Sequence, residues 1–153
     1  MITIDIPQVA KIELQHAVFD INGTLAVDGL LIPGASDQLS MLAGQLSIHL
    51  LSAGTHGNLE VIAHKLGYPL QVITSGEDKV RYVQQLGPAN VIAFGNGAND
   101  VGMLRTAAVG VAVITAEGVA TSALQAADVL VSSPLDAIDL VLKPKRLVAT
   151  LRR

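Results

Sequence analysis

Short apolar runs alternate with helix-like segments along most of this sequence, and that alternation constrains the fold more than any other feature. At most steps the interval from one run to the next is roughly 15 to 25 residues, the spacing of βαβ units with right-handed crossovers. The runs that we read as strands are 17–19, 47–51, 70–73, 91–94, 109–113 and 129–131. We therefore predict an α/β fold, a Rossmann-like three-layer sandwich around a mostly parallel sheet.

Composition supports such a sheet. Half of the residues are hydrophobic but only 3% are aromatic, so the core must be aliphatic, as in parallel sheets covered by helices. The length of 153 residues predicts a single domain over 1–153. The absence of cysteine excludes disulfides, thiol catalysis and thiolate metal sites, and leaves oxygen ligands for a metal. No apolar run reaches the roughly 18 residues of a membrane span, and we expect a cytoplasmic protein.

Further elements are expected on either side of the first parallel strand. The alternating segments 2–6 and 11–15, separated by Pro7 and Gln8, predict an N-terminal β-hairpin. Residues 26–34 predict a compact loop or small hairpin that could act as a flap. Ser36 is a plausible N-cap for a helix to about Gly44, with an apolar face from Leu39, Met41, Leu42 and Leu46. Further helices are expected at 58–66, 77–86, 101–107, 119–126 and 135–142.

Basic residues are concentrated at the C-terminus. Five of the ten lie in the tail 143–153, namely Lys143, Lys145, Arg146, Arg152 and Arg153. We expect this tail to extend the last helix beyond Pro144, with a solvated face that pairs with an acidic surface of its own or a neighbouring subunit. Nucleic acid or anionic lipid is the alternative partner, but no aromatic residue interleaves with these charges, which argues against nucleic-acid binding.

Polar side chains follow several of the predicted strands. Asp20 ends the first strand and is followed by Asn22-Gly23-Thr24, a tight loop whose backbone N–H groups could hold an anion. Ser52, before Ala53 and Gly54, ends the second strand. Lys79 lies near the start of a helix, and Asn96, Asn99 and Asp100 follow the strand 91–94.

These groups should converge, because the carboxyl ends of parallel strands meet at one edge of a sheet. Carboxylates bind a hard cation such as Mg²⁺ through oxygen, and Lys79 with backbone N–H groups can take phosphoryl oxygens. An aspartate placed there can attack phosphorus and form an aspartyl-phosphate. The Gly95-x-Gly97 pair lacks the third glycine of a dinucleotide-binding fingerprint.

At these positions the sequence resembles the haloacid dehalogenase (HAD) superfamily of phosphatases and phosphotransferases. The segment 20–25 matches its motif Asp-x-Asp-Gly-Thr-Leu except at the third position, and 95–100 matches Gly-Asp-Gly-x-Asn-Asp except at the second. The strand ending at Ser52 and the lysine at 79 match the two motifs between them, so the likeness covers 18 to about 114. Within the superfamily the sequence looks most similar to soluble proteins related to the phosphorylation domain of P-type ATPases.

The resemblance implies a role for each matching residue. Asp20 would be the nucleophile and a Mg²⁺ ligand, and Asn22 would lend a backbone carbonyl to the metal. Phosphate would be bound by Lys79 and Ser52, with the neighbouring Asn22, Gly23 and Ala53. Asn96 and Asp100 would lie on the metal side.

Two departures from the motifs bear on activity. HAD phosphatases use the acid two residues after the nucleophile as general acid and base, whereas Asn22 cannot carry a proton. Asn96 replaces a carboxylate near the metal with a neutral amide. These changes predict slow hydrolysis or a long-lived phospho-enzyme, and they motivate the alternative of a phosphate-binding or regulatory module with little turnover.

The spacing of the motifs leaves no room for a cap domain, since ordinary βαβ connections consume the residues between them. We therefore expect an open site that accepts a small phosphorylated substrate or a macromolecule, or that a neighbouring subunit covers in a homo-oligomer. The four histidines, His16, His49, His56 and His64, show no recognisable metal-binding spacing, although His56 follows Ser52 closely and could line the site.

Overall fold

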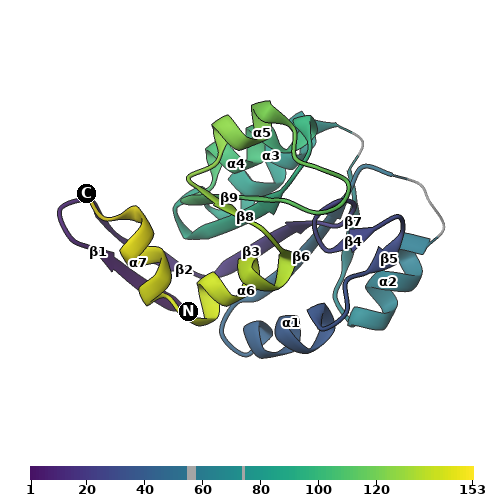
Figure 1. The fold of residues 1–153 in the computed structure, drawn as a ribbon, viewed down its shortest axis with the longest axis horizontal. Helices are drawn as coiled ribbons and strands as arrows, with labels where there is room; N and C mark the ends of the chain where they lie inside the picture. The colour runs from purple at the N-terminus through teal and green to yellow at the C-terminus, as the bar shows by residue number, and fades with distance from the viewer. Residues whose placement is uncertain (55–57, 74) are drawn as a thin grey trace.

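The computed structural model describes residues 1–54, 58–73 and 75–153. At its centre is a six-stranded sheet with strand order β10-β9-β8-β3-β6-β7, in which every neighbouring pair is parallel (Figure 1). Its strands are β3 (His16–Asp20), β6 (Ser47–Ser52), β7 (Leu70–Val72), β8 (Val91–Gly95), β9 (Val109–Val113) and β10 (Val129–Val131). The predicted α/β fold is confirmed.

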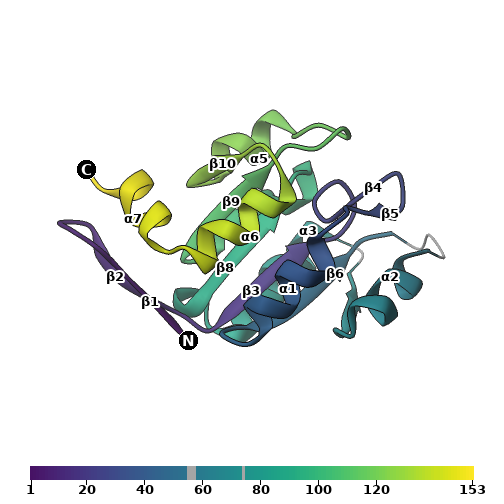
Figure 2. The same cartoon turned by 60° about the horizontal axis from the view of Figure 1, so that its bottom comes forward.

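Helices cover both faces of this sheet, which makes three layers (Figures 1 and 2). One face carries α1 (Ala35–Ala43), α2 (Asn58–Leu66) and α6 (Pro134–Leu142), and the other carries α3 (Gly76–Leu86), α4 (Val101–Thr106) and α5 (Thr121–Ala126). Short 3-10 turns, η1 (Pro88–Asn90) and η2 (Ala98–Asp100), flank β8. Alternate residues of β3, β6 and β8 enter the two resulting apolar clusters, and β8 and β9 are buried along their whole length.

Two antiparallel hairpins lie at opposite ends of the sheet (Figure 1). The N-terminal hairpin, β1 (Ile2–Ile6) with β2 (Ala10–Leu14), precedes the amino end of β3 and packs against the C-terminal helix α7 (Lys145–Leu151). The small hairpin β4 (Ala26–Val27) with β5 (Leu30–Leu31) follows the carboxyl end of β3. Both predicted hairpins are therefore present, and we call the second one the flap.

The start of α1 differs from the prediction. The N-cap residue is Gly34, with φ of +86°, and not Ser36. A left-handed backbone at Gly34 turns the chain into the helix two residues earlier, and no side chain caps it. Leu39 and Leu42, three residues apart on one face of the helix, are buried as expected, whereas Met41 lies on another face and is 57% exposed.

The basic tail is also not the expected extension of the preceding helix. Lys143 leaves helical geometry with φ of −122° and ψ of 68°, because the ring of the following Pro144 disfavours a helical residue before it. A separate helix, α7, then begins, and Leu147 on it is fully buried. Lys143 and Arg146 pair with Asp139 at 2.6 and 3.3 Å, so part of the basic charge meets an acid of the same chain. None of the helices in the described ranges has the length and apolar character needed to cross a bilayer.

Candidate active site

The candidate nucleophile lies at the end of the strand in the middle of the sheet. Asp20 is the last residue of β3, between β6 and β8, and is only 6% exposed. The loop after it is closed by backbone hydrogen bonds, since the Ile21 carbonyl accepts from Thr24, Leu25 and Ala26. A neighbouring strand on each side and a tight loop hold the carboxylate in one place.

Gly23 is required by this loop. Its φ of +77° is a left-handed conformation, and a Cβ built there would lie 2.3 Å from Nδ2 of Asn96. The Gly23 N–H also donates to the Ala26 carbonyl at 2.7 Å. Only glycine combines a left-handed backbone with the absence of a Cβ, and this explains the glycine at position 23.

Lys79 joins two carboxylates in the interior. Its Nζ donates to Oδ1 of Asp20 and to Oδ1 of Asp100, each at 2.6 Å, and the lysine side chain is fully buried. Lys79 lies in the first turn of α3, whose N-terminus is capped by Ser75 through the Asp78 N–H. A cation there is unfavourable to the helix dipole, so the two carboxylates are what stabilise it.

Asp100 is hydrogen-bonded to the backbone of its own loop. Its Oδ2 accepts the N–H groups of Asn96 and Gly97 at 3.0 and 2.9 Å, while its Oδ1 faces Lys79. A Cβ at Gly95 would lie 2.6 Å from this carboxylate, so glycine is needed where β8 ends. Asp100 thus caps the turn η2 and takes part in the charged cluster at the same time.

The burial of this cluster determines its ionisation. Burial, followed by the charge of Asp100, raises the pKa of Asp20 to about 7, against the opposing effect of Lys79. Burial alone would lower the pKa of Lys79, but the charges of Asp20 and Asp100 raise it above its ordinary value. A second cation beside Asp20 would therefore favour its anionic form.

Other predicted residues lie close by without joining these ion pairs. Ser52 ends β6 beside β3, is 1% exposed, and accepts the Gly54 N–H at 3.2 Å. Asn96 donates from Nδ2 to the Gly118 carbonyl at 3.1 Å and accepts from Thr24 Oγ1 at 3.4 Å.

The remaining predicted positions are less closely defined. Asn22 and Ala53 are half-buried in the loops after β3 and β6, and Asn99 is exposed on η2. His56, which we expected to line the site, lies outside the described residues.

Two threonine side chains near the site were missed by sequence reasoning. The single proton of the Thr24 hydroxyl is shared between Oδ2 of Asp20 at 3.5 Å and Oδ1 of Asn96 at 3.4 Å, whereas the sequence pointed only to the backbone N–H of Thr24. Thr115 Oγ1 donates to the Gly23 carbonyl at 2.8 Å and ties the loop after β9 to the site. A hydroxyl residue just after an apolar strand was the signal that identified Ser52, and the same signal was available for Thr115.

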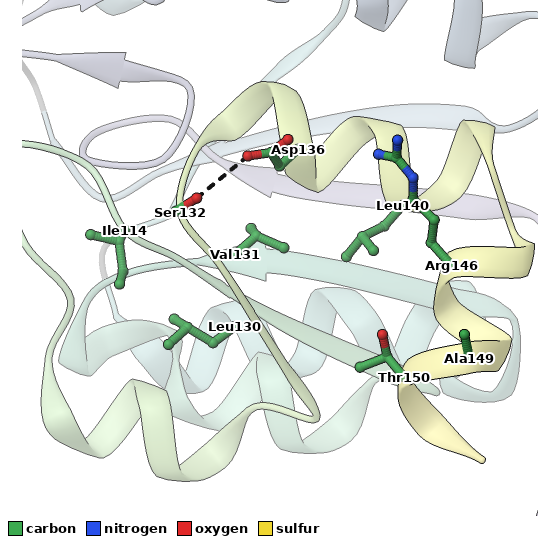
Figure 3. A pocket seen from close by; sticks show the side chains of 9 residues that line it. All are labelled: Ile114, Leu130, Val131, Ser132, Asp136, Leu140, Arg146, Ala149 and Thr150. Atoms are coloured by element: carbon green, nitrogen blue, oxygen red, sulfur yellow. Dashed lines mark hydrogen bonds between the residues drawn. The ribbon is translucent and has the colours of Figure 1, made fainter.

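A cavity of about 430 Å³ reaches the loop after Asp20 through Asn22, although Asp20, Lys79 and Asp100 do not line it. It is lined by Asn22, by Asp28 and Gly29 of the flap, by Asn58 and Leu59 of α2, and by Glu117. A cavity of about 620 Å³ lies elsewhere, at the sheet edge formed by β10 and under α6 and α7 (Figure 3). The residues lining that second cavity include none of the predicted site residues, so its larger volume does not make it the candidate site.

The charged cluster offers two carboxylates as ligands for a divalent cation. Within the described ranges no group of three or more His, Cys, Asp or Glu side chains is placed to hold a metal ion. Oδ1 of Asp20 and Oδ1 of Asp100 both contact the Lys79 ammonium, so a cation would bind these carboxylates on a side that Lys79 does not occupy. Two carboxylates completed by carbonyl oxygens and water suit Mg²⁺, which retains several waters and takes few protein ligands.

Comparison with solved structures reveals the same fold in phosphatases. A probable YrbI-family phosphatase of Pseudomonas syringae pv. phaseolica has a TM-score of 0.70 at 20% identity, over 89% of each chain. The 3-deoxy-D-manno-octulosonate 8-phosphate phosphatase of Moraxella catarrhalis, solved with magnesium, phosphate and KDO, has a TM-score of 0.67 at 16% identity over 91% of this chain and 94% of that one. A zinc-transporting PIB-type ATPase has a TM-score of 0.66 at 25% identity, over 78% of this chain and 20% of its own.

Sequence comparison supports the same assignment. An uncharacterised protein of Methanocaldococcus jannaschii is 37% identical over 78 residues, which cover 48% of this chain and 84% of that protein. The family model of haloacid dehalogenase-like hydrolases matches residues 53–136, more than half of the chain. The protein therefore belongs to the haloacid dehalogenase-like hydrolase family.

Proposed function

We propose that this protein is a Mg²⁺-dependent phosphohydrolase that acts through an aspartyl-phosphate on Asp20, as a single domain over 1–153. The observation that carries the proposal is the buried bridge from Lys79 to both Asp20 and Asp100 at 2.6 Å. Membership of a hydrolase family and the magnesium and phosphate bound to the Moraxella phosphatase of the same fold support it.

In the proposed reaction an Asp20 carboxylate oxygen attacks phosphorus, and the bond from phosphorus to the leaving-group oxygen breaks. The Lys79 ammonium and the Ser52 hydroxyl would stabilise the phosphoryl oxygens. The N–H groups of Gly23 and Thr24, which the sequence suggested for this role, already donate to carbonyl oxygens of their own loop. Water then attacks the aspartyl-phosphate, which releases inorganic phosphate and regenerates Asp20. Mg²⁺ held by Asp20, Asp100 and the Asn22 carbonyl, with Asn96 nearby, would neutralise the charge of the phosphoryl group.

Because Asn22 replaces the general acid and base, the proton-transfer steps should be slow. Its amide cannot donate a proton to the leaving oxygen or take one from the attacking water, so both protons must exchange with solvent. General acid–base help is typically worth about 10²- to 10⁴-fold. We therefore expect the phospho-enzyme to accumulate, and substrates with a good leaving group to react fastest.

The cavity beside Asn22 offers room for the leaving group. Its volume of about 430 Å³ suits a small phosphorylated metabolite, and we propose such a compound, in the cytoplasm, as substrate. Asp28 and Glu117 at the rim would disfavour leaving groups that carry a further negative charge.

The test is phosphate release from acetyl phosphate and p-nitrophenyl phosphate with Mg²⁺, followed by intact mass for covalent phosphate. The wild-type chain should gain one phosphoryl group, and Asp20→Asn should lose both the adduct and the phosphate release. Release that persists in Asp20→Asn would rule out Asp20 as nucleophile.

The alternative function is a phosphate-binding or regulatory module with little or no turnover, which the amides of Asn22 and Asn96 favour. Asn22→Asp separates the two, because restoring the missing acid should raise the dephosphorylation rate by about 10²-fold or more if the rest of the site is catalytic. Asn22→Ser is the matched control, since a hydroxyl cannot replace the acid. Phosphate binding without release of product in both variants would favour the alternative.

A further inference from the structure

A second group of functional side chains lies on the α3 face of the sheet, near its amino end. His16 begins β3, and His49 lies on the adjacent β6, where it pairs with Val18. Nδ1 of His16 and Nε2 of His49 are 3.1 Å apart. The other ring nitrogen of His49, Nδ1, lies 2.9 Å from the hydroxyl of Tyr82 on α3. The proposed reaction uses none of these three residues.

We propose that His16 and His49 form a binding site for a borderline transition-metal cation of the Cu²⁺, Ni²⁺ or Zn²⁺ class, with water as the remaining ligands. Bonds from such a cation to imidazole nitrogen are about 2.0–2.1 Å long. Two nitrogens 3.1 Å apart then enclose an angle of about 100° at the metal, between the square-planar and the tetrahedral value. The backbone register of β3 and β6 thus already sets the spacing that two cis ligands need.

Tyr82 provides the outer contact that metal-binding histidines usually have. A ligating imidazole typically hydrogen-bonds a second group through its other nitrogen, which fixes its tautomer and ring orientation. In His49 the hydroxyl of Tyr82 holds Nδ1, which leaves Nε2 to face His16. The rings of His49 and Tyr82 also meet edge-on, with centroids 5.7 Å apart, so the orientation of His49 is fixed by packing as well.

The state of the pair suits metal binding. Burial lowers the pKa of His16, and burial together with the charge of His16 lowers the pKa of His49. Both imidazoles are thus neutral near pH 7, as ligation requires. Both residues are only half-buried, so solvent can reach the site and complete the coordination.

This site is chemically distinct from the proposed Mg²⁺ site. Imidazole nitrogen suits copper, nickel and zinc, whereas Mg²⁺ prefers oxygen. With only two protein ligands, affinity should follow the order Cu²⁺ above Ni²⁺ and Zn²⁺. Mg²⁺ at millimolar concentration should not displace the bound metal.

The experiment is a Cu²⁺ titration of the full chain in a non-coordinating buffer, read by calorimetry and by electron paramagnetic resonance. The wild type should bind one Cu²⁺ with the hyperfine signature of two imidazole nitrogens. His16→Gln and His49→Gln should each lose that signature, with a fall in affinity of at least tenfold. Tyr82→Phe should keep two nitrogens but bind roughly 10-fold more weakly.

The control is the double variant His56→Gln/His64→Gln, which retains the pair and should bind like the wild type. Circular dichroism of each variant before titration establishes that it is folded. Should His49→Gln not fold, the wild-type spectrum and His16→Gln alone decide the matter. Wild-type binding through fewer than two nitrogens, or equal affinity in wild type and His16→Gln, would overturn the proposal and leave adventitious surface binding only.

Discussion

At the scale of single residues, Lys79 is the group that joins the two carboxylates of the candidate active site. A buried ion pair broken by removing one partner costs about 3–5 kcal/mol, because the remaining charge is left without compensation in the interior. Lys79 has two such partners and is fully buried. Its removal should therefore affect folding as well as phosphate binding.

We predict that Lys79→Met lowers the free energy of unfolding by about 3 kcal/mol or more without metal, and abolishes phosphate release. Chemical denaturation in EDTA measures the first effect, and the acetyl phosphate assay with Mg²⁺ measures the second. The double variant Asp20→Asn/Lys79→Met should recover part of the stability, because one unpaired carboxylate is then gone. A double variant less stable than Lys79→Met would contradict this account of the cluster.

Residue types and spacing sufficed to select Asp20, Lys79 and Asp100, which the structure brings together, although their catalytic roles remain predictions. The sequence did not reveal that Lys79 would bridge both carboxylates, because side-chain reach across three elements is a tertiary property. The Asn96 side chain contacts Gly118 and Thr24, partners that lie on loops whose path no local pattern sets.

At the scale of elements, α4 and β9 approach each other tightly at Gly110. A Cβ built at Gly110 would lie 2.3 Å from the backbone carbonyl oxygen of Leu104. Backbone atoms cannot swing aside as a side chain can. Gly110 thus allows α4 to lie directly on the sheet and to present the loop with Asp100 at the carboxyl edge.

We predict that Gly110→Ala lowers the free energy of unfolding by about 1–3 kcal/mol, the usual cost of overpacking, as measured by urea denaturation. Gly44→Ala is the matched control, because that Cβ would meet its nearest atom at 3.4 Å and φ is −67°. Equal stability of the two variants would show that α4 can shift away from β9 at no cost.

A pH dependence follows from the packing of β6 against α3. Burial, with a contribution from the charge of His16, lowers the pKa of His49 in the folded state. The unfolded chain then binds more protons than the folded one as the pH falls below about 6.5. The stability that His49 contributes is therefore present above that pH and is lost on acidification.

We predict that His49→Gln loses less stability than the wild type between pH 7.5 and pH 5.0, as measured by urea denaturation in EDTA. The exposed His64 serves as control, and His64→Gln should retain the wild-type slope. The same slope in His49→Gln and the wild type would mean that protonation of His49 is not linked to unfolding.

Hydrophobic periodicity predicted the six parallel strands and most helices, because the inner strands are buried on both faces and read as apolar runs. The edge strands β7 and β10 are partly exposed but are also mostly apolar. The predicted start of α1 was wrong by two residues, since the left-handed turn at Gly34 leaves no polar cap to recognise. The separate helix α7 was missed because its buried residue, Leu147, lies among basic residues that predicted a solvated face.

At the scale of the whole molecule, the two ends of the sheet carry different features. The carboxyl end carries the charged cluster and the flap, and within the described ranges no separate domain covers it. The amino end is closed by the N-terminal hairpin and α7, where α7 packs against β1 (Figure 2). A homo-oligomer that covers the open end remains a prediction, which a monomeric mass by light scattering would contradict.

The closure of the amino end should contribute to stability but not to chemistry. Leu147 is fully buried in the cluster that also contains Ile2, Ile4 and Ile6 of β1. Leu147→Ala should therefore cost about 2–5 kcal/mol through lost burial and the cavity left behind, measured by chemical denaturation. Leu124→Ala is the control, because Leu124 is 39% exposed on α5 and its truncation should change stability by about 0.5 kcal/mol or less.

Under conditions where Leu147→Ala remains folded, its rate of phosphate release should equal that of the wild type, because α7 lies at the opposite end of the sheet from Asp20. A reduced rate in the folded variant would mean that the two ends of the sheet are coupled.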